Sequence, residues 1–130
     1  MSLKVPVALL ERAKASDVED ADFIACVRDS LPYAWQVISN VADRLHTEGG
    51  DYVDDNSVPS SDVEQGQLLR ALASSSMRRA LERHFGVALE FQNCCKVAAF
   101  RADAVDGAAH REFVSPRAQL LNQSPQLLSC

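Results

Sequence analysis

The feature that most constrains this chain is a change of hydrophobic period at Gly86. Before Gly86, apolar residues recur every three or four positions, which is the spacing of one face of an α-helix. After Gly86, apolar and polar residues alternate over positions 87–92, which is the pattern of a strand with one buried face. The chain is therefore predicted to be an α+β protein, mostly helical in its N-terminal two-thirds and followed by a small, largely antiparallel sheet.

Three helices are predicted in the first fifty residues. The first runs over residues 5–15, and the spacing Ser-x-x-Glu at 16–19 predicts a capped start for the second. Pro32 separates the second helix from the third, because proline is tolerated only in the first turn. Gly49 is predicted to end the third helix.

Two further helices are predicted after a flexible acidic loop at about 49–60, which is rich in Gly, Asp, Asn, Ser and Pro. The spacing Ser-x-x-Glu at 61–64 predicts the start of the fourth helix, and three serines at 74–76 separate it from the fifth. Gly86 is predicted to end the fifth helix.

Strands are predicted at 87–92 and 96–101, and a short alternation at 111–114 is interpreted as a third. Residues 102–109 are either a loop or one helical turn. A serine followed by Pro116 predicts a short C-terminal helix over 116–121. The predicted core contains Ile24, Val27, Trp35, Ile38, Val41, Leu69, Leu72, Leu81, Phe91 and Phe100.

Composition is that of an ordinary globular protein, because 47% of the 130 residues are hydrophobic and 24% are charged. One core is expected at this length, so residues 1–130 are predicted to form a single domain. The N-terminal apolar run meets charge within ten residues, and no window approaches the roughly 18 apolar residues of a membrane span. We therefore expect a cytoplasmic protein without a membrane segment.

Charge is unevenly distributed along the chain, whose net charge is −5. Residues 1–60 carry five Lys or Arg against eleven Asp or Glu, whereas residues 61–101 carry six against four. An acidic chain neutralises phosphate poorly, so nucleic acid is not expected as a partner. Opposite charges steer proteins toward one another, and the distribution therefore favours a protein partner or self-association.

Four stretches of the chain carry a resemblance to known sequences: residues 30–35, which read Ser-Leu-Pro-Tyr-Ala-Trp, and residues 67–87, 91–94 and 120–130. They resemble a family of small actinomycete proteins of unknown function. The resemblance covers nearly the whole chain. It implies a bacterial cytosolic protein and assigns no site residue.

The sequence contains no nucleophile elbow, phosphate-binding loop, dinucleotide fingerprint or His-Glu-x-x-His motif. A thiol that meets a distant histidine in space is the enzymatic alternative, and its weak candidates are Cys94 with His84 or His110. Chance approach of three His and four Cys in a small domain is the simpler explanation of such a pair. We therefore expect neither catalysis nor a cofactor.

The four cysteines are expected to be free thiols, as in a reducing compartment. Donors of the type that zinc prefers are His84, Cys94, Cys95, His110 and Cys130. However, the Cys-x₂-Cys spacing of zinc sites is missing, and adjacent residues 94 and 95 would face opposite sides of a strand. No metal site is therefore predicted, and a metal-binding protein remains an alternative.

Residues 65–85 can also be drawn as a helix-turn-helix, which is the alternative that involves DNA. Arg78, Arg79 and Arg83 project from its second helix, and only Arg79 and Arg83 share a face. Glu82 lies among them, which favours a solvated face or a surface that pairs with the acidic N-terminal helices. These three arginines are a candidate interaction surface, and a weak DNA binder remains an alternative.

The sequence thus favours a non-enzymatic cytoplasmic domain that acts through protein association, with regulation as one use of such binding. A deep pocket that holds Cys94, His84 or His110 would favour an enzyme instead. One exposed positive patch formed by the three arginines would favour a DNA binder.

Overall fold

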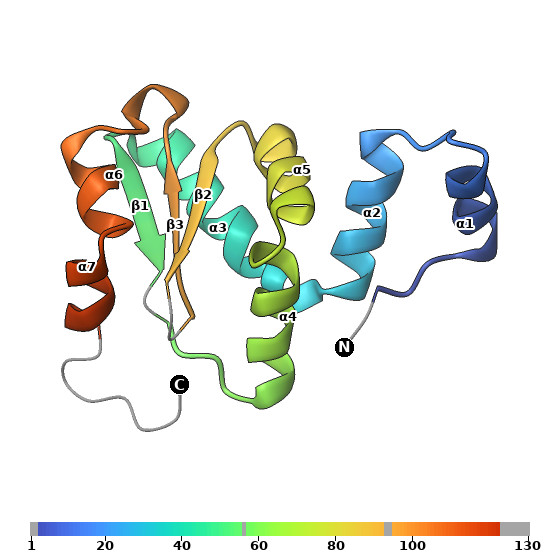
Figure 1. Cartoon of the computed structure of the whole chain (residues 1–130), viewed down its shortest axis with the longest axis horizontal. Helices are drawn as coiled ribbons and strands as arrows, with labels where there is room; N and C mark the ends of the chain where they lie inside the picture. The colour runs from blue at the N-terminus through green and yellow to red at the C-terminus, as the bar shows by residue number, and fades with distance from the viewer. Residues whose placement is uncertain (1–2, 56, 93–94, 123–130) are drawn as a thin grey trace.

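The computed structural model describes residues 3–55, 57–92 and 95–122, and it confirms the α+β class (Figure 1). The elements in chain order are α1 (Val7–Lys14), α2 (Asp20–Ser30), α3 (Pro32–Glu48), β1 (Tyr52–Asp55), α4 (Asp62–Leu72), α5 (Ser75–Phe85), β2 (Ala88–Gln92), β3 (Lys96–Phe100), a 3₁₀ turn (Ala102–Ala104), α6 (Ala108–Phe113) and α7 (Pro116–Leu121).

The three strands form an antiparallel sheet in the order β1-β3-β2. Phe100 of β3 pairs with Tyr52 of β1 on one side and with Ala88 of β2 on the other. The two strands predicted after Gly86 and the antiparallel pairing are therefore confirmed.

Two predictions about the sheet were wrong. The predicted loop at 49–60 contains β1, and the predicted strand at 111–114 is instead the end of α6 and the residue after it. β3 is the central strand, and β1 and β2 occupy both of its edges, so no edge of β3 remains for residues 111–114. β1 forms a strand only by pairing with a segment more than forty residues away, which local sequence does not reveal.

The two predicted capping boxes had different outcomes. Ser61 Oγ accepts a hydrogen bond from the backbone N–H of Glu64 at 3.2 Å, so the predicted cap of α4 is confirmed. The prediction for residues 16–19 was wrong, because α2 begins at Asp20 with no side-chain cap. Ser16 instead takes a positive φ of 58° in the turn between α1 and α2.

The start of α3 is capped by a residue from another helix. The side-chain oxygen of Gln67, on α4, accepts hydrogen bonds from the backbone N–H groups of Tyr33 at 2.7 Å and Ala34 at 3.2 Å. Leu31, which precedes α3, offers no side-chain cap of its own. Gln67 is buried, so its amide satisfies two helix-terminal donors in a place that water does not reach freely.

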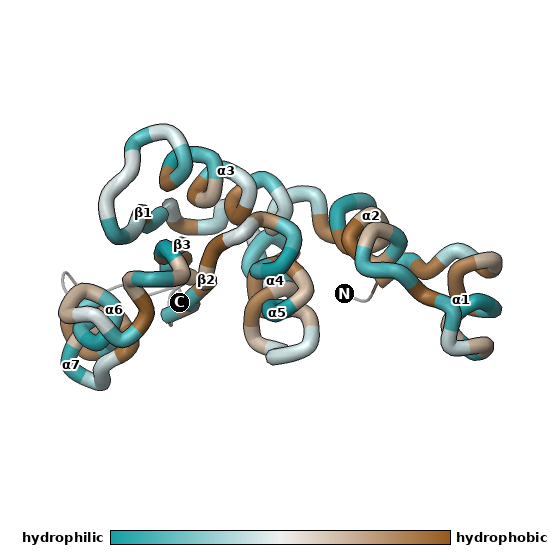
Figure 2. Tube along the Cα trace, turned by 90° about the horizontal axis from the view of Figure 1, so that it is seen from above, coloured by the Kyte–Doolittle hydropathy of each residue, from teal (hydrophilic) through white to brown (hydrophobic). Residues whose placement is uncertain are grey.

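Helices cover both faces of the sheet. α3 packs along β1 and β3 on one face, and α6 and α7 lie over the opposite face (Figures 1 and 2). α4 and α5 pack beside β2, and α2 packs on α3 and α5. α1 lies at the end of the molecule farthest from the sheet (Figure 1).

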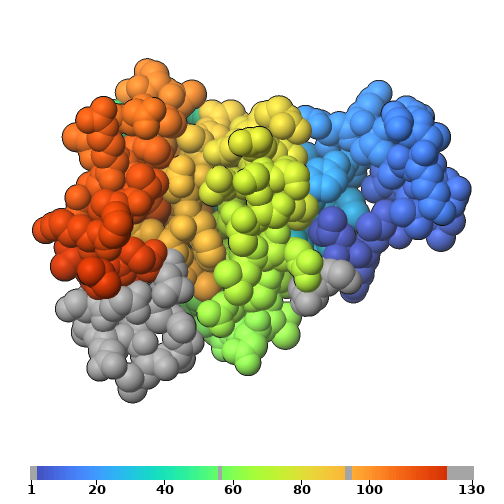
Figure 3. All heavy atoms as spheres, in the orientation of Figure 1, coloured from blue at the N-terminus to red at the C-terminus, as the bar shows by residue number. Residues whose placement is uncertain are grey.

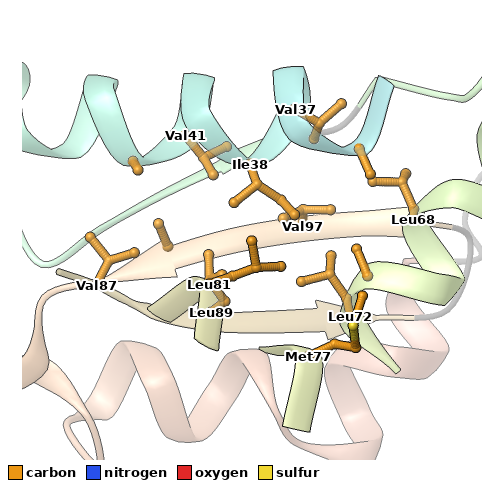
Figure 4. Close-up of a cluster of buried hydrophobic side chains, with 14 of the residues drawn as sticks. Val37, Ile38, Val41, Leu68, Leu72, Met77, Leu81, Val87, Leu89 and Val97 are labelled. Carbon is orange, nitrogen blue, oxygen red and sulfur yellow. The ribbon is translucent and has the colours of Figure 1, made fainter. Parts of the chain in front are cut away.

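The main core lies between α3, the sheet, α4 and α5 (Figure 4). The predicted core residues that are buried are Ile24, Val27, Ile38, Val41, Leu72, Leu81 and Phe100. Trp35 and Phe91 are only partly buried against this core. The prediction for Leu69 was wrong: its side chain is 47% exposed, because α4 buries the face that carries Leu68 and Leu72.

A second, smaller core lies on the other face of the sheet. It contains Ala98 and Phe100 from β3 and Phe113 from α6. The rings of Phe100 and Phe113 meet edge to face, with centroids 5.6 Å apart. Alternate residues of β3 therefore serve two different cores, which explains why this strand is apolar on both faces.

Candidate interaction surfaces

The two histidines predicted as partners of a catalytic thiol lie in different parts of the fold. His84 is exposed on α5, and its ring centroid is 5.4 Å from that of Trp35 at the margin of the main core. His110, on α6, is buried in the smaller core, and its ring centroid lies 5.0 Å from that of Phe100. Cys94 and Cys130 lie outside the described residues. Each histidine thus packs in its own apolar cluster.

His110 is hydrogen-bonded through both ring nitrogens. Its Nε2 lies 3.2 Å from Glu90 Oε1, and the backbone N–H of Asp106 donates to Nδ1 at 3.1 Å. The bond from Asp106 requires a lone pair on Nδ1, so the neutral ring carries its proton on Nε2 and donates it to Glu90. Both ring nitrogens thus have partners within the protein, and the residue is 8% exposed.

A hollow of about 460 Å³ lies beside this cluster, between β2 and the segment from α6 to α7 (Figure 3). Gln92 lines it, but its side-chain amide donates to the Phe113 carbonyl at 2.7 Å and accepts from Asn122 at 2.9 Å. Glu90 also lines it and is engaged by His110. These polar groups therefore hold α6 and α7 on the sheet.

A second hollow of about 530 Å³ lies between α3 and the end of β1, and it includes Tyr33, Asp43 and Asp55. Burial raises the pKa of the Tyr33 hydroxyl, and the nearby carboxylates of Glu64 and Asp55 raise it further. Tyr33 therefore stays protonated near neutral pH and cannot serve as a base. One carboxylate oxygen of Asp55 already accepts from the backbone N–H of Ser57 at 2.7 Å.

The two cysteines in the described ranges are free and buried. Burial raises the pKa of the Cys95 thiol, although a hydrogen bond with Gln65 partly offsets the rise. The Cys26 thiol lies 3.6 Å from the carbonyl oxygen of Lys4, to which it donates. Within the part of the chain that is described, no three His, Cys, Asp or Glu side chains are grouped as metal ligands.

The three arginines predicted as an interaction surface have different surroundings. Arg83 donates two hydrogen bonds to the carboxylate of Asp20, at 2.8 and 3.1 Å. This hydrogen bonding lowers the pKa of Asp20 and raises that of Arg83. Arg79 is exposed and Arg78 is half-buried. Arg83 thus pairs with the acidic start of α2, which was one of the two interpretations of the sequence.

Two exposed apolar side chains lie one turn apart on α1. Val7 is 76% exposed and Leu10 is 45% exposed, and α1 has no buried residue. We call Val7 and Leu10 the α1 face. The helix is attached to α2 by polar contacts, chiefly an ion pair of 2.7 Å between Arg12 and Asp22. The sequence predicted the helix, but its amphipathic spacing did not reveal that this side would remain uncovered.

A scan against protein-family models matches the chain over residues 1–130 with the family described as NucS shadow ORF. The chain belongs to this family. Neither the curated proteins nor the solved structures gave a match.

Membership in the NucS shadow ORF family assigns no ligand and no catalytic residue to the chain, because the description refers to a reading frame and not to an activity. Across the described ranges, none of the helices combines the length and the apolar character needed to cross a bilayer. The features that bear on function are therefore those of the structure itself: the hydrogen-bonded histidine, the buried thiols, the paired arginine and the uncovered α1 face.

Proposed function

We propose that this chain is a non-enzymatic protein of the actinomycete cytoplasm that acts through association with a protein, in a regulatory role. The observation that carries the proposal is the uncovered α1 face. The arrangement of His84 and His110 in separate clusters, with both nitrogens of His110 engaged, argues against a Cys/His enzyme.

An eight-residue helix that buries none of its side chains has little to stabilise it. Isolated helices shorter than about 12 residues are marginal in water. α1 gains its contacts from Arg12, which pairs with Asp22 and Asp17, and from the preceding segment, where the Lys4 N–H donates to Ser30 Oγ at 2.8 Å. Covering Val7 and Leu10 with an apolar partner surface would add roughly 2–4 kcal/mol of hydrophobic stabilisation.

The test is a comparison of two double variants with the wild-type chain. Val7→Asp/Leu10→Asp removes the α1 face, and Leu120→Asp/Leu121→Asp is the matched control, because both of these leucines are also exposed. We expect an association that only the α1 variant loses. Light scattering over a range of concentrations would detect self-association, and cross-linking followed by affinity capture in the native host, repeated with the partner as bait, would detect binding to another protein. Equal loss in both variants would show nonspecific apolar contact, and a strictly monomeric chain without a captured partner would refute the proposal.

Duplex DNA is not proposed as a partner, because Arg83 is engaged by Asp20 and the chain carries a net charge of −5. Fluorescence anisotropy with random duplexes at physiological salt should show no sub-micromolar binding. Tight binding that disappears in an Arg78→Ala/Arg79→Ala/Arg83→Ala variant would establish the helix-turn-helix alternative instead.

The family description favours a second candidate, in which the chain has no function of its own. A shadow open reading frame is one that overlaps another gene in a different frame, and the gene that the description gives is that of NucS. The codons of that gene would then determine the amino-acid sequence of this chain.

These two candidates are separated in the native host. Mass spectrometry can search for the tryptic peptide of residues 102–111, and stop codons can be placed in this frame that leave the NucS sequence unchanged. Detection of the peptide, with a defect caused by the stop codons, would support a function of the chain. Failure to detect the peptide in deep proteomes, with no defect, would support the second candidate.

A further inference from the structure

The turn before α6 is held by His110 in a way that depends on its protonation state. His110 is the third residue of α6, and its Nδ1 accepts the backbone N–H of Asp106, which lies just before the helix. A side chain at this position of a helix commonly accepts a hydrogen bond from a backbone N–H at the helix start, as Glu does in a capping box. Histidine can do so only while Nδ1 carries no proton.

The turn itself needs such a restraint. Asp106 has a positive φ of 67°, which costs free energy for a residue other than glycine. The next residue, Gly107, donates its backbone N–H to the Ala104 carbonyl at 3.0 Å, and a Cβ at Gly107 would lie 3.0 Å from the same oxygen. The bond to His110 therefore stabilises a backbone conformation that is unfavourable on its own.

We propose that His110 is a proton-operated latch on the 104–107 turn. The neutral ring accepts the Asp106 N–H and donates from Nε2 to Glu90. A proton from solvent that binds Nδ1 turns this acceptor into a donor, so the Asp106 bond breaks and the turn is released. The Nε2 donor stays on Glu90, which keeps α6 attached to β2.

The charged groups around His110 come from β2, β3, α6, α7 and the turn itself. Glu90 on β2 faces the ring, with its Oε1 3.2 Å from Nε2. On β3, Lys96 is paired with Asp54 of β1 at 3.4 Å, so its charge is largely compensated. The exposed charges nearby on α6 and α7 include Glu112 and Arg117, which pair with each other. Arg111 on α6 and the Asp106 carboxylate in the turn are also exposed. Of these groups, Glu90 is the one hydrogen-bonded to the His110 ring.

The experiment is a pH titration of the ¹⁵N-labelled chain by NMR, with amide hydrogen exchange corrected for its intrinsic pH dependence. The imidazole ¹⁵N shifts should show the Nε2–H tautomer at high pH. Protection of the Asp106 amide should fall about tenfold in step with the titration of His110, which corresponds to the loss of one hydrogen bond. The Val114 amide, which donates to the His110 carbonyl at 3.1 Å at the end of α6, lies outside the turn and is the internal reference.

Two variants make the outcome decisive. His110→Asn offers an acceptor that does not titrate, so protection of Asp106 should become independent of pH. Glu90→Gln keeps a side-chain oxygen for the Nε2–H and should preserve the latch at high pH. His46, whose Nε2 lies 2.9 Å from the Phe85 carbonyl, is a control histidine in another part of the fold. An Nδ1–H tautomer in the neutral ring, or Asp106 protection that ignores the His110 titration in the wild-type chain, would overturn the proposal.

Discussion

Gln67 gives the sharpest test of how this fold is held together. Gln67→Ala removes the acceptor of the Tyr33 and Ala34 N–H groups and leaves both donors at the start of α3 without a partner. A hydrogen bond contributes about 1 kcal/mol net, and a buried donor left unsatisfied costs about 1–3 kcal/mol. We therefore expect a loss of about 2–4 kcal/mol, which is a large part of a typical domain stability of about 5–15 kcal/mol.

Urea unfolding followed by circular dichroism measures this loss, which should lower the midpoint by about 1–2 M. Gln67→Glu keeps the acceptor oxygens and places a negative charge at the N-terminus of α3, so it should retain more stability than the alanine variant at neutral pH. Ser61→Ala is the matched control, because it removes an exposed local cap worth about 1 kcal/mol. A Gln67→Ala cost no larger than that of Ser61→Ala would refute the reasoning.

Three further predictions follow from single contacts. Gly66→Ala lies inside α4, where the new Cβ would have no neighbour within 4 Å, and it should stabilise the chain by about 0.5–1 kcal/mol. Gly86→Ala lies at a left-handed φ of 69° and should destabilise the chain by a similar amount in the same urea assay. Arg83→Ala should raise the pKa of Asp20 measured by NMR, because the hydrogen bonds from Arg83 lower it. Any contribution of this pair to the free energy of unfolding is present at pH values above the ordinary Asp pKa and is lost as the pH falls through the lowered pKa of Asp20. An Asp20 titration that Arg83→Ala leaves unchanged would contradict the ion pair. Cys95 should react with iodoacetamide far more slowly than an exposed thiol at pH 8, because burial raises its pKa. Rapid alkylation of Cys95 in the folded chain would show that the thiol is accessible.

Local sequence predicted most of the elements because their signals are short-range. Pro32 at the start of α3, Gly49 after its end and Gly86 in the left-handed region each act through their own backbone geometry. The same holds for Ser61, whose side chain reaches three residues along the chain. The same Ser-x-x-Glu spacing at residues 16–19 gave a wrong prediction, because Ser16 lies in the turn between α1 and α2 and no side chain caps α2.

The candidate residues were harder to interpret from sequence than the elements. Trp35, which contacts His84, and Glu90, which is hydrogen-bonded to His110, come from segments distant in the chain, so the packing of these two histidines could not be predicted from local sequence. The pairing of Arg83 with Asp20 was one of two sequence interpretations, and charge alone could not choose between them. Residue type marked these side chains as candidates, whereas their contacts in the folded chain determine what each one does.

Local sequence predicted α1 to α5, α7, the change to strands at Gly86 and the antiparallel pairing of β2 with β3. In contrast, β1, α6 and the cap of α3 depend on the tertiary structure. β1 exists because β3 offers it an edge, and α6 forms where no edge of β3 remains. Gln67 caps α3 because packing brings α4 beside it. For β1 and the cap of α3, the deciding hydrogen bonds join residues far apart in the chain, and a local pattern of side chains contains no information about such partners.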